Sequence, residues 1–171
     1  LEDQGKLDEA EPLMRRALEG SEKTLGPMHP DTLTSVNNLA SLLQAQGKLD
    51  EAEPLYRRAL EGKEKTLGPM HTSTLTSVNN LAMLLQAQGK LDEAEPLCRR
   101  ALAGKEKTLG PMHPSTLTSV NNLASLLQDQ GKLDEAEPLY RRALEGSEKT
   151  LGPMHPSTLT SVGNLAMLLQ A

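Results

Sequence analysis

A repeat of 42 residues is the feature that most constrains how this chain can fold. Gly5, Gly47, Gly89 and Gly131 follow one another at this interval, and each begins the string Gly-Lys-Leu-Asp-Glu-Ala-Glu-Pro-Leu. Aligned on these glycines, the copies differ at only eight positions. One such unit is too small to bury its own apolar faces, so neighbouring units are expected to stack. We expect a single array over 1–171, truncated at both ends, with units 5–46, 47–88, 89–130 and 131–171.

The first helix of each pair is expected just after the loop that ends in His29-Pro30 or its equivalents. Asp31, or a serine at the same position of the other copies, is the expected N-cap, because its side chain can accept a hydrogen bond from the open first turn. Gly47 then supplies the left-handed residue that ends the helix. We call these the first-type helices, and expect them near 32–46, 74–88, 116–130 and 158–170.

A second helix is expected after a very short link. Asp50 and Glu53 have the spacing of a capping box, and Pro54 lies near the start, where its missing N–H costs least. These second-type helices are expected near 7–24, 49–66, 91–108 and 133–150. A short link forces the two helices of a pair to lie antiparallel. The sequence therefore predicts an all-α fold, a right-handed superhelical α-solenoid of antiparallel helix pairs.

Composition excludes several classes of function. The chain has 18 Lys and Arg against 23 Asp and Glu, a net charge of −5, and two Tyr with no Trp or Phe. A nucleic-acid partner is not expected, because it requires a basic surface and usually stacking aromatics. A membrane partner is not expected either, because no apolar run approaches the roughly 20 residues that cross a bilayer. The single cysteine, Cys98, suits a reducing compartment, so we expect a cytoplasmic protein.

The segment from Asn38 to Leu60 resembles the tetratricopeptide repeat. The family's small residue of the first helix, its mid-repeat alanine, its aromatic residue and its late alanine correspond to Ala40, Ala52, Tyr56 and Ala59. Val36 departs from the family, which often has Trp there, and the unit is longer than the usual 34 residues. This longer form looks like the repeats of kinesin light chain and nephrocystin-like proteins. The resemblance covers essentially the whole chain and implies a protein–protein interaction scaffold.

The first-type helices have two distinct faces when residues are placed at steps of about 100°. An apolar face is expected to form the core, with Leu33, Val36, Leu39, Ala40 and Leu43 in the first such helix. In the proteins that this chain resembles, the opposite face lines a concave groove that holds an extended or helical peptide. The candidate groove is therefore Thr34, Asn37, Asn38, Ser41, Gln44, Thr76, Asn79, Asn80, Met83, Gln86, Thr118, Asn121, Asn122, Ser125, Gln128, Asp129, Thr160, Asn164 and Met167.

The chemistry of this face indicates what it would hold. An Asn amide has both a donor and an acceptor, so it can bind a peptide backbone whatever the side chains are. Met83 and Met167 add adaptable apolar contacts. The face has no Lys or Arg, and Asp129 is its only charge, which favours a neutral or basic ligand. The alternative is that these polar residues are merely solvated.

No pattern in the sequence supports catalysis, and we expect no enzymatic activity, cofactor or metal. His29 recurs once per copy, but a zinc site needs three or four converging ligands, and loop structure is the better interpretation. Cys98 takes the place of Tyr56 on an apolar face, where a packed thiol is favoured over a nucleophile. Arg57 has Glu53 four residues before it, which indicates a salt-bridged outer face.

The two ends of the chain suggest a second function. Residues 1–4 are expected to be the last turn of a first-type helix. The first and last complete helices then each lack one neighbour, and near-identical copies predict that the ends of two molecules fit head to tail. The expected contact is Leu165, Leu168 and Leu169 against Leu13, Ala17 and Leu18. The alternatives to a peptide-binding scaffold are therefore a self-associating structural module and an idealised spacer with no ligand.

Overall fold

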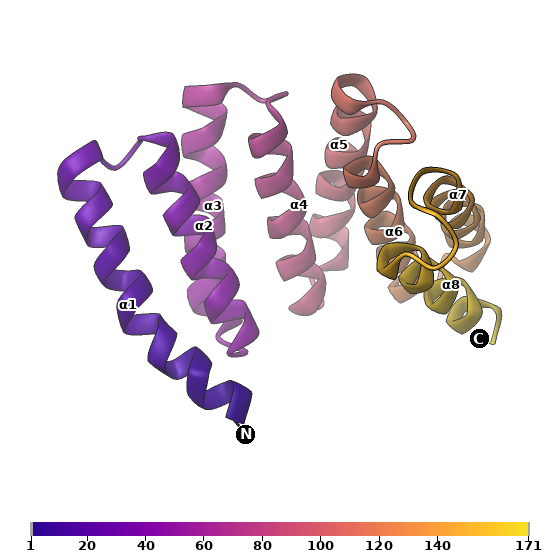
Figure 1. Cartoon of the computed structure of the whole chain (residues 1–171), viewed down its shortest axis with the longest axis horizontal. Helices are drawn as coiled ribbons and strands as arrows, with labels where there is room; N and C mark the ends of the chain where they lie inside the picture. Colours follow the sequence, from indigo (N-terminus) through magenta and orange to yellow (C-terminus); the bar gives the residue numbers. More distant parts are fainter. Residues whose placement is uncertain (1, 171) are drawn as a thin grey trace. The chain divides into compact units, whose positions relative to one another are not determined.

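The computed structural model describes residues 2–170, which form eight α-helices and no strand (Figure 1). The second-type helices are α1 (Glu2–Leu25), α3 (Leu49–Leu67), α5 (Leu91–Leu109) and α7 (Leu133–Leu151). The first-type helices are α2 (Pro30–Ala45), α4 (Thr72–Ala87), α6 (Pro114–Asp129) and α8 (Pro156–Leu169). The predicted all-α fold and the alternation of the two helix types are confirmed.

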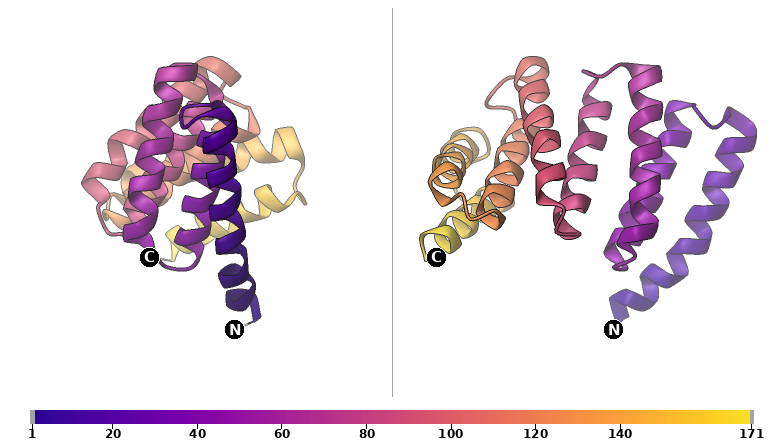
Figure 2. Two further views of the ribbon diagram at one scale, coloured as in Figure 1. Left: turned by 90° about the vertical axis from the view of Figure 1, so that its left-hand side faces the viewer. Right: turned by 180° about the vertical axis from the view of Figure 1, so that it is seen from behind.

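The chain forms two compact units, Leu1–Gln88 and Gly89–Ala171. In the first unit α1 packs against α2, α2 against α3 and α3 against α4. The second unit repeats this order from α5 to α8. Within each unit, consecutive helices run antiparallel, as the views in Figures 1 and 2 agree. Each unit is thus a stack of helix pairs, while the single array over 1–171 stays a prediction.

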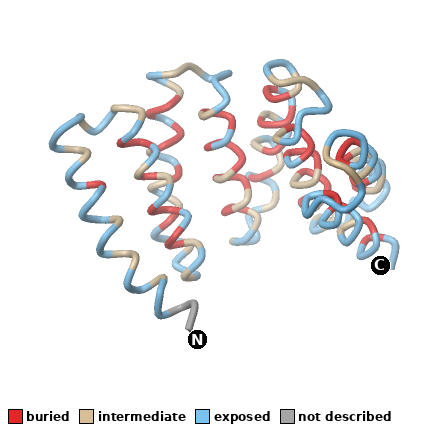
Figure 3. Tube along the Cα trace, in the orientation of Figure 1, coloured by how far each residue is buried: buried red, intermediate tan, exposed pale blue. Residues whose placement is uncertain are grey.

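The predicted apolar face of the first-type helices forms the core. In α2 the buried residues include all five predicted ones, Leu33, Val36, Leu39, Ala40 and Leu43. Helix α3 adds Ala52, Tyr56 and Ala59 from its own stripe. Figure 3 shows buried positions recurring along α2, α3 and α4, whereas among the described side chains of α1 only Leu18 is buried. Full burial of one such leucine contributes roughly 1.5–3 kcal/mol, so the first-type helices hold each unit together.

The predicted N-cap of the first-type helices is wrong. The N-cap is His29, and its ring Nδ1 accepts a hydrogen bond of 3.2 Å from the backbone N–H of Asp31. His71, His113 and His155 cap α4, α6 and α8 in the same way. Asp31 and its serine equivalents are donors through their backbone and lie inside the first turn. The histidine side chain reaches two residues forward, which allows the helix to begin at the next residue, Pro30.

The start of the second-type helices also differs from prediction. The N-cap of α3 is Lys48, whose side chain makes no capping bond, so Asp50 and Glu53 form no capping box. Helix α3 begins at Leu49, one residue before Asp50, because the turn at Gly47 has already provided hydrogen bonds to the last carbonyl groups of α2. Gly47 has a φ of 76°, and its N–H donates to the Gln44 carbonyl oxygen while the Lys48 N–H donates to that of Leu43. The predicted left-handed stop at Gly47 is therefore confirmed as a Schellman turn.

Helix α1 contradicts the prediction for residues 1–4. It runs without interruption from Glu2 through Gly5, so these residues continue a second-type helix instead of ending a first-type one. Leu1 lies outside the described residues. At Gly47 the helix ends in a turn whose hydrogen bonds reach carbonyl groups three and five residues back in the preceding helix. The four residues before the equivalent Gly5 form too short a helix to close such a turn.

Ion pairs join successive second-type helices within each unit. Arg58 of α3 lies 2.6 Å from Glu22 of α1, and the equivalent Arg142 of α7 lies 2.6 Å from Glu106 of α5. Lys48 contacts Glu11 at 2.7 Å in the same repeating manner. The two partners of each pair are 36–37 residues apart in the sequence, and charge complementarity therefore accompanies the stacking of apolar faces.

Candidate functional site

A hollow of about 460 Å³ lies between α2 and α4 in the first unit. It is lined by Ser41, Gln44, Ala45, Tyr56, Asn80 and Met83. Ser41, Gln44 and Ala45 lie on the solvent-facing side of α2 because they are opposite Leu39 and Leu43 on the helix. Asn80 and Met83 hold the corresponding positions on α4. The helical period thus brings predicted groove residues from two copies to one surface.

Hydrogen bonds orient the amides of this hollow. The Tyr56 hydroxyl donates to Gln44 Oε1 at 3.0 Å, which leaves the Gln44 amide nitrogen to donate into the hollow. Asn80 Nδ2 donates to Asn37 Oδ1 at 3.3 Å, so the amides of adjacent first-type helices are linked. Burial raises the pKa of the Tyr56 hydroxyl. The surface is therefore neutral and offers both donors and acceptors.

A second hollow, of about 310 Å³, lies between α6 and α8. Its lining consists of hydroxyl and amide side chains, namely Thr118, Asn121, Asn122, Ser125, Ser157, Thr160 and Asn164. Asn121 Nδ2 donates to Ser161 Oγ at 2.9 Å. Asn121 Oδ1 is covered from water and accepts no hydrogen bond from the described residues. An amide oxygen desolvated without a donor costs about 1–3 kcal/mol.

The remaining predicted groove residues lie in different surroundings. Thr34, Asn38, Thr76 and Met167 are exposed on the same faces but line neither hollow. Asn79 is only 9% exposed, because its turn of α4 packs closely on its neighbours. Gln86 and Gln128 are half-buried, and Gln128 Oε1 accepts a hydrogen bond of 3.0 Å from the Tyr140 hydroxyl. Asn79 is therefore a poor candidate for direct contact with a partner.

Three residues that line the hollows, Ala45, Tyr56 and Ser157, are not in the predicted groove. Tyr56 was assigned only to the apolar stripe of its helix, yet its hydroxyl reaches the first hollow. The signal was its phenol group, since a buried tyrosine hydroxyl usually finds a polar partner. Ser157 was interpreted as an N-cap, and with the cap supplied by His155 its side chain lines the second hollow.

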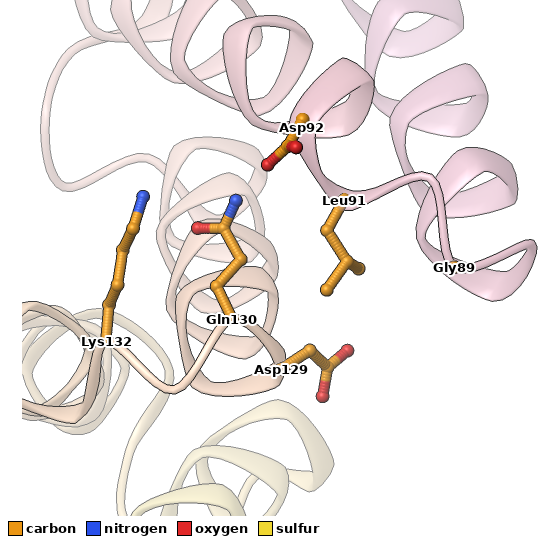
Figure 4. Close-up of a pocket in the computed structure, with 6 residues that line it drawn as sticks. All are labelled: Gly89, Leu91, Asp92, Asp129, Gln130 and Lys132. Atoms are coloured by element: carbon orange, nitrogen blue, oxygen red, sulfur yellow. The ribbon is translucent and has the colours of Figure 1, made fainter.

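Asp129 belongs to another surface. It lines a pocket of about 450 Å³ at the turn between α6 and α7, together with Gly89, Leu91, Asp92, Gln130 and Lys132 (Figure 4). Lys132 Nζ donates to Glu95 Oε2 at 2.9 Å. Hydrogen bonds from Lys132, Arg99 and Gln130 lower the pKa of Glu95 to about 2. This turn is a network of ion pairs that ties α5 to the following turn, and the one charge of the predicted groove lies beside it.

The nucleophilic and metal-binding candidates of the sequence are Cys98 and the histidine of each loop. Burial raises the pKa of Cys98 to about 11, with the negative charge of Glu95 adding to the effect, so the thiol is protonated and packed. Residues 2–170 contain no group of three or more His, Cys, Asp and Glu side chains arranged to hold a metal ion. No helix in the described part of the chain is both long enough and apolar enough to span a membrane.

Comparison with known protein families identifies the family to which these helix pairs belong. The tetratricopeptide repeat family matches residues 1–65, 72–149 and 116–171. The chain is a tetratricopeptide repeat protein. Tetratricopeptide repeats are generally non-enzymatic modules for protein–protein interaction, and this chain has their α-solenoid fold.

Several solved structures are similar to this tetratricopeptide repeat chain. The nearly identical TPR-like repeats of a Podosopora anserina protein named as a kinesin light chain share 36% identity, with a TM-score of 0.82 over 98% of this chain and 80% of that one. BtubC (BKLC) from P. vanneervenii shares 26% identity, with a TM-score of 0.84 over 99% and 67%. The N-terminal domain of stress-induced protein-1 from C. elegans, at 19% identity and a TM-score of 0.56 over 80% and 96%, shares the fold alone. No curated protein matches the chain.

Proposed function

We propose that this tetratricopeptide repeat protein is a non-catalytic, intracellular scaffold that binds a peptide or partner segment on its first-type helices. The observation that carries the proposal is the polar hollow between α6 and α8, which is lined by hydroxyl and amide side chains alone. These side chains can pair with the backbone N–H and C=O groups of a bound segment. In the other unit, the Gln44 amide nitrogen and Asn80 offer the complementary groups.

The chemistry of the hollows restricts the class of partner. Neither lining contains Lys or Arg, so a terminal carboxylate or an acidic side chain would find no counter-charge there. Amides and hydroxyls bind an extended backbone through paired donors and acceptors, and Met83 provides the main flexible apolar contact. A neutral segment with small or polar side chains fits this surface best.

A peptide-library screen against the whole 171-residue chain tests the proposal. Selected peptides are measured by calorimetry against wild type and against Asn121→Ala and Asn80→Ala, which we expect to weaken binding about 5- to 30-fold at the hollow that each variant alters. Arg141→Ala, which alters an exposed residue on α7, is the matched control and is expected to leave affinity unchanged. Selected peptides that bind all four proteins equally would refute the groove, and a screen without binders would favour a spacer.

A further inference from the structure

A buried lysine without a counter-charge lies near the end of α5. Lys105 is only 4% exposed, and its ammonium group lies 3.4 Å from the backbone carbonyl oxygen of Ser115, in the first turn of α6. This distance exceeds the roughly 2.7–3.2 Å of a good N–H···O hydrogen bond. Burial lowers the pKa of Lys105, and no carboxylate among the described residues opposes the effect. Since buried charges in proteins are normally paired, this ammonium group retains the capacity to bind an anion.

The other charged groups in this region are committed elsewhere or distant. Glu106, the next residue of α5, forms an ion pair of 2.6 Å with Arg142 of α7. His113, in the loop before α6, accepts a hydrogen bond of 3.1 Å from the helix through its ring Nδ1. The acidic residue of α6 is Asp129, which lies at the opposite end of that helix. An anion beside Lys105 would therefore meet no acidic neighbour on α6.

Ser115 places a hydroxyl group close to this ammonium group. It is the second residue of α6, and its side-chain oxygen makes no hydrogen bond to the described residues. Residues 111–114 just before it are exposed, so the segment is open to a modifying enzyme. The first turn of a helix also stabilises a negative charge, because the aligned peptide dipoles leave that end partly positive. A negative group on Ser115 would thus be stabilised by both the helix end and Lys105.

The first copy already carries a negative charge at the equivalent position. Asp31 takes the place of the serine in the first turn of α2. Its carboxylate lies 3.7 Å from His29 Nδ1, and the histidine still accepts the capping hydrogen bond. This turn of the repeat therefore accommodates an acidic group without losing its cap.

The arrangement around Lys105 recurs in the first unit. Lys63 of α3 is also 4% exposed, and burial lowers its pKa. Its backbone carbonyl oxygen accepts a hydrogen bond of 3.4 Å from the Thr74 hydroxyl, as that of Lys105 does from Thr116. Ser73, next to Thr74, is the counterpart of Ser115. The buried lysine beside a first-turn serine is thus a feature of both units.

We propose that Ser115 is a phosphorylation site and that Lys105 holds the phosphate group at the N-terminus of α6. The Ser115 hydroxyl oxygen attacks the γ-phosphorus of a nucleoside triphosphate held by a serine kinase. The bond from that phosphorus to the bridging oxygen breaks, the nucleoside diphosphate leaves, and the hydroxyl proton passes to a base of the kinase. The product carries a charge of about −1.5 to −2, which pairs with Lys105 and joins the end of α5 to the start of α6. The inference does not depend on the proposed groove.

The fourth copy supplies a matched control for this pairing. Residues 106–120 and 148–162 are identical, but Ser147 stands where the third copy has Lys105. Phosphoserine is incorporated at position 115 in one protein and at position 157 in another, and phosphorus NMR titration measures the pKa of each phosphate. The second pKa of such a phosphate is ordinarily about 6, and a nearby ammonium group lowers it because it favours the dianion. We expect the phosphate pKa at position 115 to be lower by about 1 unit or more. Lys105→Ser should remove this difference.

Two results would overturn the proposal. Equal phosphate pKa values at the two positions, or a difference that persists in Lys105→Ser, would overturn the role of Lys105. The modification itself is tested on the chain isolated from its native cells. Trypsin releases residues 108–132, which contain Ser115 and are distinguished from the other copies by Asp129, so mass spectrometry assigns a phosphate to this copy. Phosphate on Ser115 is the expected result, and a native chain without it would overturn the phosphorylation site.

Discussion

Gly20 and Gly146 allow the same substitution to be made twice in one sequence context with opposite expected results. Residues 15–30 and 141–156 are identical, so both glycines lie in the same helical segment. In α7, a Cβ on Gly146 would lie 2.6 Å from Leu117 Cδ2 and 2.9 Å from its Cδ1. In α1, a Cβ on Gly20 would meet nothing within 4 Å.

The magnitudes follow from two competing effects. Alanine in place of a helical glycine stabilises a helix by roughly 0.8–1 kcal/mol, and this gain applies at both positions. Overpacking a closed core costs typically about 1–3 kcal/mol, and it applies only where Leu117, which is buried, cannot move away. Gly20→Ala is therefore expected to raise the free energy of unfolding by about 1 kcal/mol. Gly146→Ala is expected to leave it unchanged or lower it by up to about 2 kcal/mol.

Thermal unfolding followed by circular dichroism measures the difference. For a chain of this size, 1 kcal/mol corresponds to a change in Tm of roughly 2–4 °C, so the two variants should differ by several degrees. Equal gains in Tm for the two variants would refute the claim that the leucine contact excludes a Cβ.

Two further predictions concern the caps and the ion pairs. His71→Ala should lower the free energy of unfolding by about 0.5–2 kcal/mol in urea titrations, because α4 loses its N-cap acceptor, whereas His71→Asn should retain most of it. The pKa of Glu95 is lowered from 4.5 to about 2 in the folded chain. Its ionised carboxylate therefore stabilises the folded state fully above pH 4.5, and this stabilisation is lost as the pH falls through about 2. Glu95→Gln should therefore flatten the acid limb of the stability profile, and an unchanged limb would contradict the network.

The elements of the fold were predictable because the repeat and the helical period act together. Leu33, Val36 and Leu39 recur on one face in every copy, and a single unit has no other way to bury them. The helix starts were less predictable. Asp31 is a strong N-cap by type, yet His29 takes that role because its longer side chain reaches the same first turn from two residues earlier. A cap depends on the loop conformation, which residue preferences do not determine.

The candidate site was predictable as a face but not in its details. Helical spacing correctly placed Ser41 and Asn80 on the solvent-facing side of adjacent helices, where both line one hollow. It could not show that Asn79 is nearly buried, because that depends on how closely neighbouring helices approach. The contribution of Tyr56 likewise required three dimensions, since its hydroxyl crosses from a second-type helix to reach Gln44.

The differences between copies bear on which partner the proposed groove would select. Of the eight positions at which the copies differ, three lie on the groove face, at the positions of Asn37, Ser41 and Ala45. One of them makes the two hollows unlike, because Met83 lines the first and Ser125 the second. Since the rest of the face is nearly the same in every copy, discrimination between partner segments has to come from these side chains. A segment in the first hollow would then need an apolar group for Met83, whereas a segment in the second hollow would meet hydroxyl and amide groups alone.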